Sequence, residues 1–152
     1  MSSYTEKRAK ELLLLTRDVL KSLPEVCTEF IQSIEFTTQP LTRYAYVNDL
    51  KIFCNFLVSE LPKFSDRTAQ TLTCKDFDSV TARDIRTYLE YLGFYITDDS
   101  EHSNSEPGKM RKLSSLRSFY EFLYKSEYVQ SDVSKLVDMP KRHEKPIIRM
   151  EI

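Results

Sequence analysis

The chain has 152 residues and a formal net charge of −1, which is enough for one domain of ordinary size with a terminal extension. Its composition, 41% hydrophobic with only two Gly and six Pro, is typical of a compact protein and excludes a disordered one. No apolar run approaches the about 20 residues of a membrane span, and the apolar run at 12–15 is too short for a signal peptide, so we expect a cytoplasmic protein.

The first 40 residues predict a pair of helices. Residues 5–21 have apolar side chains at helical spacing on one side. Ser22 is placed to cap a second helix, with Pro24 in its first turn and Glu25 at the capping-box position. That helix is expected to end near residue 35, where a polar connector begins. We expect both helices to pack on the rest of this chain; the alternative is contact with a neighbouring protomer.

Further helices are predicted in the middle of the chain. Thr42 is expected to cap a helix that ends near residue 61. Residues 62–78 show no sustained period and are expected to form a long loop with one short turn. Thr81 and Asp84 then form a capping box. The helix that follows them is expected to bury Ile85, Tyr88, Leu89 and Leu92.

Residues 109–127 predict the most distinctive helix, which follows an acidic and flexible surface loop at 97–108. Apolar residues recur at steps of three and four and predict a buried stripe: Met110, Leu113, Leu116, Tyr120 and Leu123. Basic or hydroxylated residues lie off that stripe: Lys109, Arg111, Lys112, Ser115 and Ser118. A face of this kind offers charge and short hydrogen bonds to a phosphate backbone.

The end of the chain predicts one short helix and a linker. Ser131 and Asp132 are expected to cap the short helix, which buries Val133, Leu136 and Val137. Residues 139–152 lack periodicity and end on apolar residues with nothing local to pack against. We therefore expect this chain to be part of a longer protein.

Charge is distributed unevenly along the chain. Residues 1–108 contain 12 basic and 17 acidic side chains, a net charge of −5, whereas residues 109–149 contain 10 basic and 5 acidic ones, a net charge of +5. The overall charge argues against nucleic acid as a default partner, but the basic part favours it. A solvated basic surface would give the same distribution.

Cysteine and histidine usage predicts neither a disulfide nor a metal centre. Cys27, Cys54 and Cys74 form an odd set without C-x-x-C spacing, so we expect reduced thiols. His102 and His143 have no second His or Cys one helical turn away. We therefore predict no metal and no other cofactor.

Several segments resemble, in order, the N-terminal core-binding domain of the tyrosine recombinases, the family of phage integrases and Xer-type resolvases. These segments are Thr42-x-x-x-Tyr46-x-x-Asp49-Leu50, Val80-Thr81-x-x-Asp84-Ile85-x-x-Tyr88-Leu89, the basic stretch 109–124, and Leu136-x-x-Met139-Pro140-Lys141-Arg142. The preceding helices resemble those of the single-recombinase Xer subgroup of Gram-positive bacteria.

The resemblance implies an all-α, SAM-like four-helix domain that clamps duplex DNA. In this family a C-terminal catalytic domain cuts DNA with a Tyr nucleophile helped by Arg, Lys and His residues. Two isolated histidines do not supply that constellation, so we expect no cleavage by this chain alone. The family also implies a homo-oligomer, a tetramer on paired sites, in the full-length protein, without a membrane or a small-molecule ligand.

The residues predicted to contact DNA are Arg111, Lys112, Lys109, Ser115, Arg43, Thr42, Lys141 and Arg142. The first four share the exposed face of the basic helix, whose N-terminal partial charge also favours phosphate. The next two lie at a predicted helix start, where Arg43 is expected to be exposed, and the last two in the linker. Arg117 is instead spaced to pair with Glu121 one turn later.

We predict a helical extension at 1–38, a DNA-binding core-binding domain at 39–139, and a linker toward a catalytic domain at 140–152. The alternative is a helical protein-interaction module without a nucleic-acid role. The acidic first 108 residues favour this alternative, and the basic, serine-rich face after Lys109 opposes it.

Overall fold

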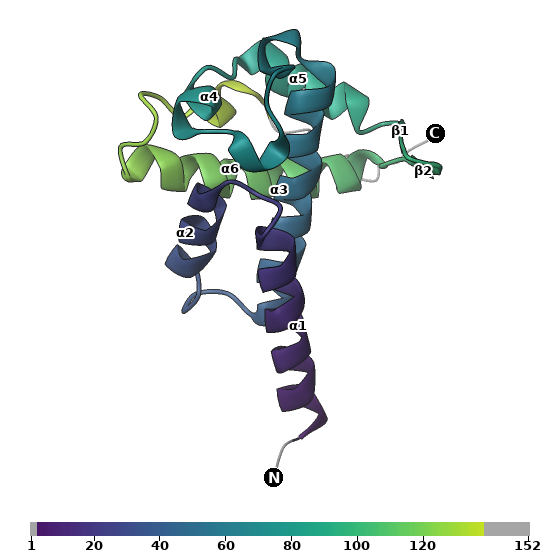
Figure 1. Ribbon diagram of the computed structural model, residues 1–152, viewed down its shortest axis with the longest axis vertical. Helices are drawn as coiled ribbons and strands as arrows, with labels where there is room; N and C mark the ends of the chain where they lie inside the picture. The colour runs from purple at the N-terminus through teal and green to yellow at the C-terminus, as the bar shows by residue number, and fades with distance from the viewer. Residues whose placement is uncertain (1–2, 139–152) are drawn as a thin grey trace, which may run out of the picture.

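The computed structural model describes residues 3–138, and these residues form an almost entirely helical structure (Figure 1). The elements in chain order are α1 (Tyr4–Leu20), α2 (Glu25–Ser33), α3 (Pro40–Glu60), the 3-10 turns η1 (Pro62–Phe64) and η2 (Ala69–Thr71), α4 (Cys74–Asp78), α5 (Ala82–Tyr91), β1 (Tyr95–Thr97), β2 (Ser100–His102), α6 (Glu106–Lys125) and η3 (Val133–Leu136). The all-α prediction is confirmed. Within residues 3–138 every helix is too short or too polar to span a lipid bilayer.

The core lies where α6 crosses α3 (Figure 1). Four of the five side chains in the predicted stripe of α6 are at most 2% exposed: Leu113, Leu116, Tyr120 and Leu123. The fifth, Met110, is only partly buried. Phe119 from the same helix packs edge-on against Phe30 of α2 and Phe77 of α4, with ring centroids 5.4 and 5.2 Å away. One aromatic ring thus connects three elements that are distant in the sequence.

The first two helices pack on the rest of the chain, as predicted. α1 runs beside α3 and buries Leu12 and Thr16, and α2 contacts both α3 and α6. The predicted cap at Ser22 is wrong: α2 begins at Glu25, Pro24 is its N-cap, and the Ser22 hydroxyl donates to the Val19 carbonyl. Ser22 belongs to the turn that ends α1, since both its N–H and its hydroxyl donate to the Val19 carbonyl.

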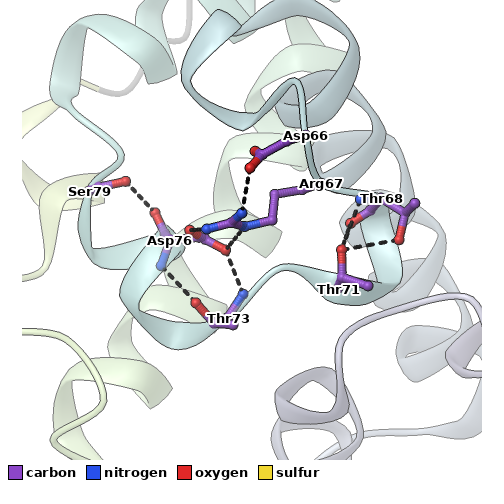
Figure 2. Close-up of polar contacts among 7 residues, drawn as sticks. All are labelled: Asp66, Arg67, Thr68, Thr71, Thr73, Asp76 and Ser79. Atoms are coloured by element: carbon purple, nitrogen blue, oxygen red, sulfur yellow. Dashed lines mark hydrogen bonds and ion pairs between the residues drawn. The ribbon is translucent and has the colours of Figure 1, made fainter.

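Residues 62–78, predicted as a long loop, are instead organised by local hydrogen bonds (Figure 2). Thr73 and Asp76 form a capping box on α4, in which the Thr73 N–H donates to Asp76 Oδ2 at 2.9 Å. Arg67 donates to the same carboxylate from Nε at 3.0 Å and from Nη2 at 3.3 Å. Polar bonds rather than a periodic apolar stripe define this segment, so the hydrophobic pattern did not reveal it.

Residues 97–108 are not the predicted flexible loop. Tyr95 pairs with His102 across an antiparallel hairpin, with the two rings stacked 4.7 Å apart. Asp98 has a φ of 49° in the turn, a conformation that Asp tolerates. α6 then starts at Glu106, before the predicted start at Lys109, because Pro107 fits the first helical turn.

Of the two remaining predicted helices, one is as expected and the other is not. The capping box of Thr81 and Asp84 on α5 is confirmed. The last short helix is a 3-10 turn capped by Asp132, and Leu136, predicted to be buried, is 68% exposed. A 3-10 turn has a tighter repeat than an α-helix, which rotates this side chain out of the core.

The Asp76 cluster predicts how stability depends on pH. Burial alone raises the pKa of Asp76, but the hydrogen bonds from Arg67 and Thr73 outweigh burial and lower that pKa overall. The stabilisation is therefore present above the unfolded pKa of about 4 and is lost as pH falls through the lower folded value. Asp76→Asn is expected to reduce the free energy of unfolding by about 1–2 kcal/mol at pH 7 and by less near pH 3, measured by urea denaturation.

Asp66→Asn is the matched control, because the Asp66 side chain bonds the same Arg67 but is 74% exposed. Its expected effect at pH 7 is below about 0.5 kcal/mol. Equal losses from both variants, or a loss from Asp76→Asn that does not change with pH, would contradict the assignment.

Candidate nucleic-acid interface

A buried carboxylate joins the two central helices at their crossing. Asp49 of α3 is 4% exposed and accepts hydrogen bonds from Arg111 and Ser115 of α6. Arg111 Nη1 lies 2.7 Å from Oδ2, and Nη2 lies 3.0 Å from Oδ1, so the pair is bidentate. Ser115 Oγ lies 2.6 Å from Oδ2. Three donors satisfy a charge that would otherwise be costly to bury.

The spacing on α6 explains this arrangement. Arg111 and Ser115 are four residues apart, so they lie one turn apart on the same side of the helix. The shorter Ser115 is buried at 1% exposure, whereas the longer Arg111 side chain is 52% exposed. The guanidinium therefore lies at the surface above the carboxylate, and Asp49 uses two of its five N–H groups.

Lys112 and Lys109 lie near the start of the same helix. Lys112 Nζ donates to Asn104 Oδ1 at 2.8 Å, and Asn104 Nδ2 donates to the Leu92 carbonyl at the end of α5. Burial lowers the pKa of Lys112 and Arg111 lowers it further, while Asp49 acts in the opposite direction. Lys109 Nζ lies beside Gly93, where an added Cβ atom would be 3.2 Å from it. Both lysines are partly buried.

Three predicted contact residues are placed differently from the expectation. Ser115 is buried beneath Arg111 and its hydroxyl bonds Asp49, so its predicted position on the exposed face is wrong. Thr42 is not an N-cap: α3 begins at Pro40 after the N-cap Gln39, because proline favours the first helical position.

Arg43 is not exposed at a helix start. Its Nη1 donates to the carbonyls of Glu35 and Thr38 at 2.9 and 2.6 Å, which fixes the connector between α2 and α3. Arg117 does not pair with Glu121 but donates to the Val137 carbonyl. Lys141 and Arg142 lie outside the described residues.

Asp49 and Asn104 have roles at this site that the sequence did not reveal. In the sequence, Asp49 stands out only as part of the segment that resembles the tyrosine recombinases. Asp49 lies one helical turn from Tyr46 and from Phe53, among apolar residues. A carboxylate in such a position indicates a buried ion. Its partner lies 62 residues away, and no local pattern identifies a partner at that separation.

The Asp49 network predicts a measurable contribution to stability. Asp49→Ala removes the carboxylate that accepts from Arg111, and it leaves the buried Ser115 hydroxyl with only the more distant Arg111 carbonyl, at 3.4 Å. We expect the free energy of unfolding to fall by about 2–3 kcal/mol, measured by urea denaturation at pH 7. Asp18→Ala, at an exposed position of α1, is the control and should change stability by less than about 0.5 kcal/mol. Equal effects of the two variants would show that the network does not hold α3 and α6 together.

Seven curated proteins match the chain, and the matches all have the name tyrosine recombinase XerC. The protein from Caldanaerobacter subterraneus subsp. tengcongensis is 33% identical over 144 residues, which is 91% of this chain and 39% of that protein. The protein from Oceanobacillus iheyensis is 35% identical over 113 residues, 74% of this chain and 30% of that protein. A third, from Leptospira interrogans, is 32% identical over 123 residues, 80% of this chain and 33% of that protein.

No family model and no solved structure matches the chain. The chain spans between 30% and 39% of the length of the three relatives described. The matches agree in name, cover most of the chain, and accompany a helical fold of the kind that the resemblance implied. The chain therefore belongs to the tyrosine recombinases of the Xer type and corresponds to a part of such a protein.

Proposed function

We propose that this chain is the core-binding domain of a Xer-type recombinase and that it binds duplex DNA through the N-terminal half of α6. The observation that supports this most directly is the cluster of Lys109, Arg111 and Lys112 within one turn of that helix. Arg111 is presented at the surface by a buried carboxylate and remains half exposed. A surface cluster of two lysines and an oriented arginine suits DNA phosphates.

The start of α6 carries charge of both signs. Glu106 in its first turn is acidic, and the cations Lys109, Arg111 and Lys112 follow it within the next two turns. The positive charge proposed to meet a phosphate is therefore that of these three side chains. Each phosphate contact should make the affinity more dependent on salt, and we expect about 4–6 contacts in all.

DNA cleavage is proposed for the whole recombinase and not for the described residues of this chain. Tyr88 and Tyr120 are buried, and burial raises the pKa of each well above its usual value. The Tyr120 hydroxyl also donates to the Phe77 carbonyl at 2.7 Å. These tyrosines are core residues, poorly suited to act as nucleophiles. Assembly as a tetramer on paired sites belongs to the same proposal.

Fluorescence anisotropy of labelled duplex DNA at about 50 and 200 mM salt tests DNA binding. The double variant Lys109→Gln/Lys112→Gln removes two charges while Gln at position 112 keeps a donor for Asn104. We expect it to weaken binding about 10-fold or more and to reduce the slope of log affinity against log salt by about 2. Thermal melts should verify that it is folded.

Lys7→Gln/Lys10→Gln is the matched control, because it removes the same charge from exposed positions of α1. It should change the affinity by less than about 3-fold, since screening limits the influence of distant charges. Equal losses from both double variants would contradict a specific interface on α6. No salt-sensitive binding by the folded wild-type chain would contradict DNA binding and favour the protein-interaction alternative.

A further inference from the structure

We infer that Asp49 is a positioning residue for DNA binding, which orients the Arg111 guanidinium so that its outward N–H groups meet a phosphate. This inference rests on the proposed function and adds to it a residue that does not touch the DNA. Asp49 itself is only 4% exposed, and its contribution acts through Arg111.

The geometry fixes the guanidinium in one orientation. Two parallel hydrogen bonds to Oδ2 and Oδ1 define the plane of the Arg111 group, which a single bond would leave free to rotate. Ser115 holds the carboxylate itself from below, at 2.6 Å. An arginine that is ordered before DNA arrives loses less conformational freedom on binding than a mobile one.

Stability alone does not explain why this ion pair is present. A well-packed apolar pair of similar volume often stabilises a fold as well as a buried ion pair or better. An apolar residue at position 49 would, however, leave Arg111 without a fixed orientation. The mixed exposure of the pair, 4% for the carboxylate and 52% for the guanidinium, is what presenting a cation to an external anion requires.

Asp49 also makes the inference testable, because its charge has the wrong sign for a DNA-binding surface. Asp49→Asn makes the chain more positive by one unit, so it should strengthen DNA binding if only the net charge matters. If Asp49 positions Arg111, the same substitution should weaken DNA binding. Arg111→Lys provides a second contrast, because it keeps the charge but loses the planar fork that matches a carboxylate bidentately.

The experiment measures DNA anisotropy against salt for the 152-residue chain and its variants, with thermal melts to verify folding. We expect Asp49→Asn to weaken binding about 3- to 10-fold and to lower the salt slope by about 1. Arg111→Lys should weaken binding by a similar factor at unchanged charge. In an Arg111→Gln background, Asp49→Asn should leave binding unchanged or strengthen it, because no arginine remains to be positioned.

Two exposed positions provide matched controls. Asp98→Asn on the hairpin removes one negative charge and should leave binding unchanged or strengthen it, and Arg86→Lys on α5 should have no effect. Folded Asp49→Asn that binds as tightly as the wild-type chain or tighter would overturn the inference. Should that variant fail to fold, wild-type affinity for Arg111→Lys would overturn it instead. Absence of salt-sensitive binding by the wild-type chain overturns the proposed function itself, which is a different result.

Discussion

The crossing of α3 and α6 depends on a charged group that the fold has to satisfy. Asp49 is almost fully removed from water, and both of its carboxylate oxygens are hydrogen-bonded by residues of α6. A carboxylate in this position restricts the rotation and register of α6 more than an apolar contact does, because hydrogen bonds are directional and apolar contacts are not. The aromatic packing around Phe119 then fills the space that this register defines.

The same register decides which charges of α6 reach the surface. Because the Ser115 side chain points into the core, Arg111, one turn earlier on the same side of α6, lies at the surface next to it. Lys112 lies beside Asn104, in the segment that precedes the helix. The structural role of this ion pair and its proposed role in DNA binding therefore depend on the same atoms. The ion pair that holds two helices together also determines the direction in which the proposed phosphate contact points.

Helices, their buried stripes and one capping box were predictable because each depends on residues close in sequence. Leu113, Leu116, Tyr120 and Leu123 recur at the helical period, and Thr81 with Asp84 forms its hydrogen bonds within one turn. Of the candidate site, Arg111 is half exposed as expected, whereas Lys109 and Lys112 are partly buried.

The exposure and the hydrogen-bond partners of individual polar side chains were not predictable, because the fold brings these partners together from distant parts of the sequence. Ser115 and Arg43 were both expected at the surface, yet one bonds a carboxylate 66 residues away and the other bonds two backbone carbonyls. The hairpin was missed for a similar reason. Its strands are too short for a periodic signal, and the stacking of Tyr95 on His102 is visible only in three dimensions.

The hairpin has a consequence for how any polyanion approaches this protein. Asp98, Asp99 and Glu101 are exposed on it, and it leads directly into the cationic start of α6. Acidic and basic side chains thus follow one another along this stretch of chain, and charges of opposite sign give a surface an uneven electric field. For the proposed polyanionic partner, the hairpin carboxylates would be repulsive and the cations of α6 attractive. The acidic residues that lower the overall charge of the chain would thus narrow the range of angles from which a productive encounter begins.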